Sequence, residues 1–302
     1  MDGIINIYKE KGFTSHDVVA VVRRTINQKK VGHTGTLDPD AEGVLPICIG
    51  KGTKLADYIM AEKKGYRAEV TLGITTTTED SSGEVIEVKP VDFDEEKIKA
   101  VVYSFKGKID QIPPMYSAIK VNGKKLYELA REGKEIERKS RTIEIYDIKI
   151  LEFLPPNKIV IDVICSKGTY IRTLCSDIGK KLGCGANMSS LLRTMSGNFT
   201  LDTAVKLDEL KNIVENNNID SILITIDQVL SDYKKVRISP KATKLLHNGG
   251  RIYEYFFAEK YDIKKGENVL VYDAEGVFIG IFKFDFDDSK KMNCVKPVKI
   301  LL

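Results

Sequence analysis

The segment from Gly32 to Pro46 constrains this chain more than any other stretch. It holds three glycines, two prolines, one histidine and three carboxylates within 15 residues. Glycine permits a positive φ and proline fixes φ, so the segment is predicted to be a loop of defined shape. Asp38 directly precedes Pro39, which biases the Asp38 backbone toward an extended conformation. Such a loop suits a carboxylate presented to a cleft, although an isolated Asp-Pro pair would favour a turn in which the Asp bonds its own backbone.

Length and composition predict a globular protein with one large and one small domain. The chain has 302 residues, of which 42% are hydrophobic and 30% charged. No apolar run approaches the length of a membrane span. The first residues lack a basic region followed by an apolar run, so no secretory signal is expected and a cytoplasmic location follows.

Cysteine and histidine patterns argue against disulfide and metal chemistry. The five cysteines form no CxxC pair, and an odd count without a secretory signal argues against a disulfide framework. Only three histidines are present, without an HExxH motif. We therefore predict no metal site, which disfavours a deaminase or a metallohydrolase.

Positive charge is concentrated in the stretch 120–141. This stretch holds eight basic and four acidic residues, and its excess equals the net charge of +4 of the entire chain. Two interpretations remain open: a solvated helix with i,i+4 ion pairs, or an arm that faces phosphates. The near neutrality of the remaining chain favours a monomer.

Hydrophobic periodicity predicts alternating strands and helices over the first 230 residues. Thr14 and Asp17 have the spacing of a capping box, so a helix is expected to begin there. A second helix is expected to open at Thr53. The other expected elements are strands at 4–8 and 66–72, a polar loop at 75–83, a helix at 92–105, a hairpin of strands 142–151 and 158–165, a helix from about 170, and short helical patterns at 207–214 and 219–230.

The pattern changes near Tyr233. A short helix is expected at 240–247, and the apolar runs 268–272 and 276–282 flank a turn, as in a β-hairpin. The predicted fold class is therefore α+β: a large mixed, mainly antiparallel sheet with flanking helices over residues 1–232, then a small β-rich module at 233–302. Residues 115–141 would form an insertion arm within the first domain.

Several motifs together resemble the TruB family of tRNA pseudouridine synthases. The Asp38 loop reads G-H-T-G-T-L-D-P, close to the family's catalytic-aspartate motif. The same resemblance extends to four further segments: Thr14–Val19, Lys64–Arg67, Pro113–Ala118 and Ser166–Arg172. It implies the pseudouridine synthase fold, a PUA-like RNA-binding C-terminal module, and isomerisation of a uridine without metal, ATP or redox cofactor. The implied target is the T-loop uridine at tRNA position 55, flipped out of its stack.

The resemblance also assigns roles to individual residues. Asp38 would be the nucleophile and Arg172 its ion-pair partner, since a guanidinium keeps its proton and holds a carboxylate in a planar fork. Tyr66 would be a further catalytic residue, which stacks on the uracil and whose hydroxyl helps the C5 proton to depart. The remaining assignments are Tyr170 and Leu191 in the pocket wall, Lys54 orienting the loop or reaching a phosphate, and His33 filling the space left by extruded nucleotides. Arm 115–141 would contact the RNA.

One motif departs from the family pattern. The loop after Gly73 commonly reads T-D-T-x-D in the family, whereas Thr77 stands at the position of the first Asp in this chain. A role for a carboxylate at position 77 is therefore in doubt, while Asp80 keeps the second acid. Attack at C6, attack at C1′ and a glycal route all fit these residues. Two other functions compete with the synthase: a non-catalytic RNA-binding or chaperone protein, and an acid-base hydrolase using Asp38 with Asp40 or Glu42.

Overall fold

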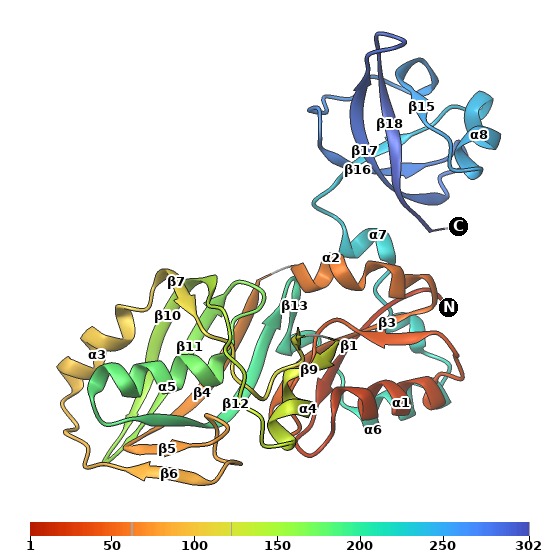
Figure 1. Ribbon diagram of the computed structural model, residues 1–302. Coiled ribbons are helices and arrows are strands. Elements are labelled where there is room, and N and C mark those ends of the chain that lie inside the picture. The colour runs from red at the N-terminus through yellow and green to blue at the C-terminus, as the bar shows by residue number, and fades with distance from the viewer. Residues whose placement is uncertain (62, 122, 302) are drawn as a thin grey trace.

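Two β-sheets organise the chain (Figure 1). The computed structural model describes residues 1–61, 63–121 and 123–301. A nine-stranded sheet with helices occupies the first 200 residues, and a five-stranded sheet follows from residue 234. The predicted α+β class is confirmed.

The large sheet is mixed and mainly antiparallel, as predicted. Its order is β1-β3-β12-β4-β11-β10-β7, with β2 paired to β3 and β13 paired to β12. The β3–β12 pair is parallel, and the other pairs are antiparallel. Its strands are β1 (Gly3–Lys9), β2 (Val31–His33), β3 (Glu42–Ile49), β4 (Lys64–Leu72), β7 (Gly107–Gln111), β10 (Arg141–Leu154), β11 (Lys158–Cys165), β12 (Ala186–Ser196) and β13 (Phe199–Thr200).

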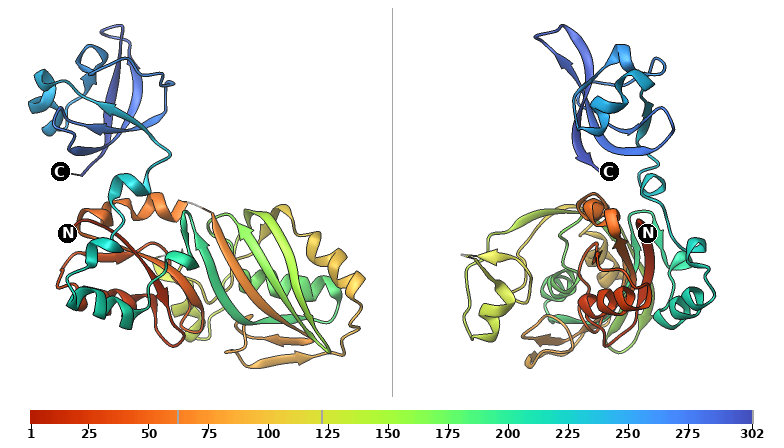
Figure 2. Two further views of the ribbon diagram at one scale, coloured as in Figure 1. Left: turned by 180° about the vertical axis from the view of Figure 1, so that it is seen from behind. Right: turned by 90° about the vertical axis from the view of Figure 1, so that its right-hand side faces the viewer.

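Helices cover one face of the β4–β11–β10 half of this sheet. Tyr66, Ala68 and Val70 alternate toward that face and pack in the main core cluster with residues of α3 and α5. Arg67 points the other way and pairs with Asp162, on a face that Figure 2 shows without helices. The helices are α1 (Ser15–Thr25), α2 (Ala56–Ala61), α3 (Glu95–Tyr103), α4 (Leu126–Arg131), α5 (Ile171–Leu182), α6 (Leu207–Glu215), α7 (Ile226–Val229) and α8 (Thr243–His247).

The first helix begins where the capping box predicts. Thr14 is the N-cap of α1: its hydroxyl accepts from the Asp17 N–H, and the Asp17 carboxylate accepts from the Thr14 N–H. The apolar face of α1, with Val18 and Val22, packs with α6 against β1 and β3. This packing sets the start of α1 beside the Asp38 loop.

Four sequence expectations need correction. The helix expected to open at Thr53 begins as a 3-10 turn, η1 (Gly50–Leu55), and becomes α-helical only in α2. The loop at 75–83 is flanked by a two-stranded sheet, β5 (Ile74–Thr76) and β6 (Val85–Val88). Helix α3 is shorter than 92–105 because the Asp94 side chain caps it. The pattern at 219–230 is split between η3 (Ile219–Ser221) and α7.

The arm at 115–141 projects in front of the large sheet (Figure 1). It contains a short hairpin, β8 (Lys120–Val121) and β9 (Lys124–Lys125), followed by α4. Leu126 and Leu129 of α4 are buried, while most of the charged side chains of the arm are exposed.

The five-stranded sheet has the order β14-β16-β17-β18-β15. The predicted hairpin is present as β16 and β17, and the helix expected at 240–247 consists of the 3-10 turn η4 (Pro240–Ala242) and α8. The strands are β14 (Lys234–Arg237), β15 (Ile252–Tyr253), β16 (Asn268–Tyr272), β17 (Phe278–Asp287) and β18 (Met292–Ile300).

This C-terminal sheet docks on η1 and α7. Leu55, Ile226 and Leu230 form one buried cluster with Leu270, Ile281 and Leu301 of the C-terminal part. Burying these apolar side chains together fixes the C-terminal sheet against η1 and the α7 segment. Within the described ranges, no helix is both long and apolar enough to cross a membrane.

Candidate functional site

The Asp38 loop connects β2 to β3 and is anchored at both sides of Asp38. Leu37 is buried, and its backbone N–H and carbonyl both bond the Ser15 hydroxyl at the start of α1. On the other side, the Pro39 carbonyl accepts from the Gly12 N–H, 2.9 Å away. The Asp38 side chain remains 44% exposed, so the loop buries this carboxylate only in part.

Lys9 supports the same loop through hydrogen bonds to its backbone. Its side chain is fully buried at the end of β1, and its ammonium donates to the carbonyls of Glu10, Pro39 and Ala41. Burial lowers the pKa of Lys9 to about 8, and the nearby carboxylates of Glu42, Asp38 and Asp40 oppose that shift. Nothing in the sequence pattern singled out this lysine.

Arg172 joins three segments around Asp38. It is the second residue of α5 and is 8% exposed. Its Nε lies 3.2 Å from Asp38 Oδ2 and its Nη1 lies 3.6 Å from Asp80 Oδ2. Nη1 also donates to the Thr78 carbonyl and Nη2 to the Tyr116 carbonyl, at 3.2 and 2.8 Å. One guanidinium therefore ties the Asp38 loop, the 77–80 loop and the base of the arm together.

The Asp38 carboxyl is subject to opposing influences. Burial in the site raises the pKa of Asp38 above its ordinary value, Arg172 and Lys9 lower it, and Asp80 and Asp40 raise it. Arg172 thus favours the ionised form of a carboxylate that its surroundings would otherwise protonate more readily.

Asp80 belongs to this site despite the departure at Thr77. Its carboxylate, 17% exposed, faces Arg172 and accepts from the Thr78 hydroxyl at 2.6 Å and from the Ser82 N–H at 3.0 Å. The hydroxyl of Thr77 instead accepts from the Glu84 N–H at 3.1 Å. The sequence pattern left the role of this loop in doubt, and the structure brings Asp80 to the site.

Tyr66 lies on β4 beside a buried arginine. Arg193 of β12 is its cross-strand neighbour and is 1% exposed. Burial raises the pKa of Tyr66, while the Arg193 charge lowers it. Asp38 also raises the pKa of Tyr66, which places the two side chains within electrostatic reach of each other.

His33 is the last residue of β2, before the Asp38 loop, and Tyr170 lies two residues before Arg172. The His33 Nδ1 accepts from the Gly35 N–H at 3.2 Å, and its ring packs edge-on against His16. Burial lowers the pKa of His33, which favours the neutral ring. Tyr170 is the N-cap residue of α5, and its backbone exchanges two hydrogen bonds with the Gln111 amide.

The two remaining expected site residues are Leu191 and Lys54. Leu191 is 9% exposed and lies in the main core cluster, against which Tyr66 also packs. The Lys54 ammonium donates to the Ile300 carbonyl at 2.8 Å, so it links η1 to the last strand of the C-terminal sheet. The structure does not bring Lys54 to the Asp38 loop.

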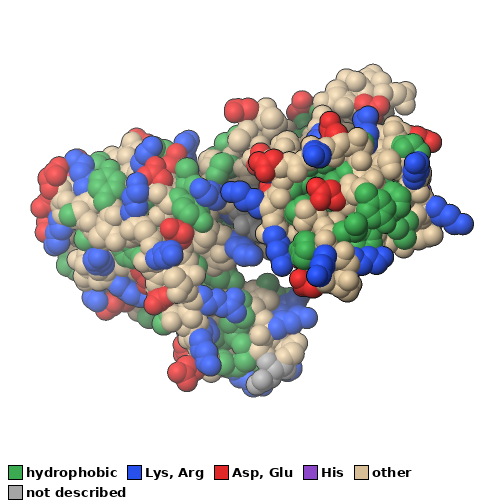
Figure 3. All heavy atoms as spheres, turned by 90° about the horizontal axis from the view of Figure 1, so that it is seen from above, with side chains coloured by type: hydrophobic (Ala, Val, Ile, Leu, Met, Phe, Trp, Pro, Cys, Tyr) green, Lys and Arg blue, Asp and Glu red, His purple; other side chains and the backbone are tan. Residues whose placement is uncertain are grey.

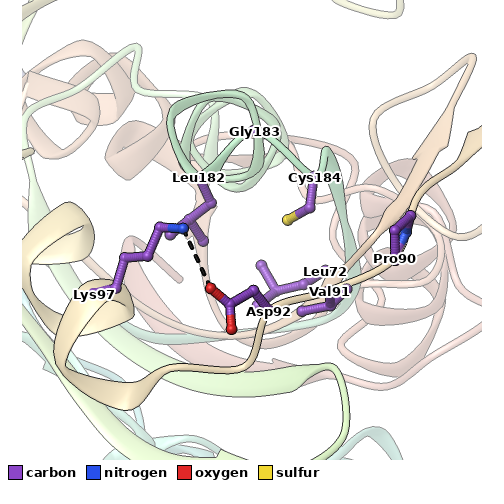
Figure 4. A pocket seen from close by; sticks show the side chains of 8 residues that line it. All are labelled: Leu72, Pro90, Val91, Asp92, Lys97, Leu182, Gly183 and Cys184. Carbon is purple, nitrogen blue, oxygen red and sulfur yellow. Dashed lines mark ion pairs between the residues drawn. The ribbon is translucent and has the colours of Figure 1, made fainter.

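A separate hollow lies beyond the far end of α5 (Figure 4). The ends of β4 and α5 and the residues before α3 line this hollow. Lys97 and Asp92 form an ion pair there, with Nζ 3.6 Å from Oδ2. It contains none of the residues around Asp38. In the ranges that the structure describes, no three His, Cys, Asp or Glu side chains gather as a metal ion would require.

Two family models match consecutive parts of the chain. The N-terminal domain model of the TruB family pseudouridylate synthases matches residues 23–171, and the C-terminal domain model of tRNA pseudouridylate synthase B matches residues 172–233. Asp38 and Tyr66 fall within the first match, and Arg172 opens the second.

Similar proteins align along nearly the full chain. The tRNA pseudouridine synthase B of Alkaliphilus oremlandii is 50% identical over 98% of both chains, and that of Lachnoclostridium phytofermentans is 49% identical over 100% of both. Among solved structures, a Cbf5-Nop10-Gar1 complex has a chain with a TM-score of 0.74 and 28% identity, covering 99% of this chain and 85% of that one. An H/ACA RNP bound to a substrate RNA contains a chain with the same TM-score and 26% identity, with the same coverage.

Proposed function

Because the chain belongs to the TruB family of pseudouridine synthases, we propose that it isomerises the uridine at position 55 of the tRNA T loop, with Asp38 as nucleophile. The full-length relatives named tRNA pseudouridine synthase B support tRNA as the substrate. The reaction breaks the bond between ribose C1′ and uracil N1 and reattaches the base through C5, which requires no cofactor.

The Asp38–Arg172 pair carries this proposal. A nucleophilic carboxylate must be ionised, reachable and held in one orientation. Asp38 is partly exposed, its loop is anchored by Ser15 and Lys9, and the Arg172 guanidinium lies 3.2 Å from its carboxylate. The same pair disfavours the hydrolase alternative, because Arg172 links Asp38 to Asp80 and not to Asp40 or Glu42.

The neighbouring residues would then hold a flipped-out uridine. Tyr66 would stack on the uracil, Tyr170 and Leu191 would limit the pocket, and His33 would occupy space on the loop side. A base inside a stem-loop cannot reach Asp38 while stacked, so the RNA must extrude it. For Lys54, the bond to Ile300 supports a different proposal, in which it holds the C-terminal part in place.

The charge distribution supports an RNA surface on both sides of the site. The arm has eight basic against four acidic residues, residues 233–302 have 14 against 9, and the remaining residues have 25 against 30. Figure 3 shows Lys and Arg side chains around a hollow between the lobes of the molecule. We propose that residues 1–232 are the catalytic domain, with the arm at 115–141 clamping the T arm, and that residues 233–302 are a PUA-like RNA-binding domain.

Tritium release from a T-arm stem-loop with C5-labelled uridine tests the proposal. Wild-type protein should release tritium, and Asp38→Asn should not, while RNA binding stays within about 3-fold because the amide has the size of the carboxylate. Asp40→Asn is the matched control, since Asp40 lies two residues away and is exposed. RNA binding without release by the wild type would favour the RNA-binding or chaperone alternative.

A further inference from the structure

Glu79 has a backbone conformation that residues with a side chain rarely adopt. Its φ is +64°, in the left-handed region, where the Cβ atom is strained against the backbone. Such strain persists only where surrounding contacts hold it, and it is common beside functional sites. Glu79 lies within the 77–80 loop, between two residues that both contact Arg172.

The turn at Glu79 brings two acceptors to one atom of Arg172. The Thr78 carbonyl accepts from Arg172 Nη1 at 3.2 Å, and Asp80 Oδ2 lies 3.6 Å from the same nitrogen. These two acceptors belong to the residues on either side of Glu79. The left-handed turn therefore makes both neighbours of Glu79 converge on a single guanidinium nitrogen.

This convergence determines which way the guanidinium of Arg172 faces. Its Nη1 is held by the 77–80 loop, and its Nη2 donates to the Tyr116 carbonyl at 2.8 Å. A planar group that is held at two of its nitrogens cannot rotate freely. The third nitrogen, Nε, then faces Asp38, and it lies 3.2 Å from Oδ2.

The Glu79 side chain is locked to α5 beside Arg172. The hydroxyl of Thr173 donates to Glu79 Oε2 at 2.6 Å, a distance typical of a hydroxyl bound to an ionised carboxylate. Thr173 directly follows Arg172 and is buried. The Glu79 carbonyl accepts from the Met188 N–H of β12 at 3.0 Å. The strained residue is therefore held by its side chain to α5 and by its backbone to the central sheet.

We propose that Glu79 is a positioning residue: its carboxylate, held by Thr173, keeps the 77–80 loop in the turn that orients Arg172. This inference rests on the proposed function, in which Asp38 is the nucleophile. Two adjacent residues of α5 then have separate tasks. Arg172 holds the nucleophile, and Thr173 holds the loop that orients Arg172.

Single-turnover tritium release with saturating stem-loop RNA tests the proposal at Thr173. Thr173→Val removes the hydroxyl with little change of shape, and it should slow the reaction by about 10- to 100-fold because a misplaced guanidinium no longer holds the nucleophile. Thr173→Ser keeps the hydroxyl and should stay within about 3-fold of the wild type. An unchanged rate in Thr173→Val, or an equal loss in both variants, would overturn the proposal.

A double-mutant cycle tests whether Glu79 and Thr173 act as one unit. Glu79→Ala removes the carboxylate that accepts from Thr173 and should slow the reaction to a similar extent. The double variant Glu79→Ala/Thr173→Val should be no more than about 3-fold slower than the slower single variant, because both changes break the same bond. If the two effects multiply, the residues act separately and the proposal fails.

A matched control separates this role from a loss of stability. The Thr225 hydroxyl donates to Asp227 Oδ1 at 2.7 Å at the start of α7, so Thr225→Val also removes a bond from threonine to a carboxylate. Thr225→Val should lower the thermal midpoint and leave the single-turnover rate unchanged. If it slowed the reaction as much as Thr173→Val does, a general loss of stability would explain both results and refute the proposal.

A second measurement is independent of turnover. In ¹⁵N-labelled protein, the Nε–H resonance of Arg172 is identified by its loss in Arg172→Lys. Thr173→Val should shift this resonance, whereas the Nε–H of Arg67, which bonds Asp162 at 2.9 Å, should not move. An unmoved Arg172 resonance would overturn the proposal. A shifted resonance together with no tritium release by the wild type would reject the proposed function and keep the link from Glu79 to Arg172.

Discussion

At the scale of single residues, Asp38 shows how one carboxylate depends on its neighbours. Burial raises the pKa of Asp38 and Arg172 lowers it. Because the nucleophile must be ionised, we expect the single-turnover rate to fall as the pH drops through the pKa of Asp38, above the ordinary range of an aspartate. Arg172→Met removes the lowering influence, so this acid limb should move to higher pH.

Rate measurements from about pH 4.5 to 8.5 with saturating stem-loop RNA would locate the limb. Arg172→Lys keeps a positive charge and should shift the limb less than Arg172→Met. An acid limb at the same pH in the wild type and in Arg172→Met would show that another group controls it.

Lys9 is the residue whose loss should disturb the Asp38 loop most directly. Lys9→Met leaves the carbonyls of Pro39 and Ala41 without their buried donor, which should cost about 1–3 kcal/mol of the free energy of unfolding. Urea unfolding of both proteins measures this, with Lys11→Met as an exposed control. An equal loss of stability in Lys9→Met and Lys11→Met would contradict the support of the Asp38 loop by Lys9.

The same lysine predicts a pH dependence with a defined sign. The pKa of Lys9 is about 8 in the folded protein, below its ordinary value of 10.5, so the unfolded chain binds more protons between these values. The contribution of Lys9 to stability should therefore increase as the pH rises from 8 to 10.5. Lys9→Met should lack this increase, and parallel stability curves of the two proteins would argue against it.

The chain indicated Asp38, Tyr66 and Arg172 through local motifs, and the structure brings Asp38 and Arg172 into contact. It gave no signal for Lys9 or Arg193, because the Pro39 carbonyl bound by Lys9 and the Val44 carbonyl bound by Arg193 lie 30 and 149 residues away in the chain, and any buried lysine or arginine looks like a surface residue in sequence. A local sequence motif does not show which distant segments of the chain come into contact.

At the scale of elements, α1 was predictable because its cap is local, whereas β12 was not predicted. Both faces of the strand 186–196 are partly buried. In addition, β-bulges break its period-2 alternation between Met188 and Ser190 and between Arg193 and Met195. The central strand that carries Leu191 and Arg193 therefore has no strand-like pattern of its own.

The parallel contact of β12 with β3 depends on Gly43. Its φ is +102°, and a Cβ there would lie 2.3 Å from the Arg193 carbonyl oxygen, a backbone atom that cannot rotate away. We expect Gly43→Ala to lower the thermal midpoint and the rate together. Gly107→Ala is the matched control, because its φ is +109° but a Cβ would meet nothing within 4 Å.

The control Gly107→Ala should lose only the free energy of unfolding that the strain of a positive φ costs, about 1–2 kcal/mol. Gly43→Ala should exceed it in a calorimetric comparison, since strands β3 and β12 must also separate. Equal losses in both variants would mean that backbone strain, and not the close approach of the two strands, explains why glycine is needed.

At the scale of the whole molecule, the excess of positive charge is found in two parts of the chain. The arm and the C-terminal part carry the positive excess, and they lie on either side of the hollow seen in Figure 3. Helix α6 lies on the opposite side of the molecule from the arm, as the right-hand view of Figure 2 shows. The net charge of the chain does not tell whether RNA contacts the arm or the α6 side of the molecule, but the salt dependence of RNA binding does.

Lys120 and Lys139 of the arm are exposed, and no described carboxylate forms an ion pair with either. If both contact phosphates, the double variant Lys120→Ala/Lys139→Ala should reduce the slope of log Kd against log salt by about 1.4–1.8. The control is Lys206→Ala/Lys211→Ala, which removes the same charge at and beside α6 and should leave the slope unchanged because α6 lies on the opposite side of the molecule from the arm. Titrations of a T-arm stem-loop at several salt concentrations measure both slopes. Equal reductions in the two double variants would reveal a response to net charge, and the arm would then lose its assignment as the RNA clamp.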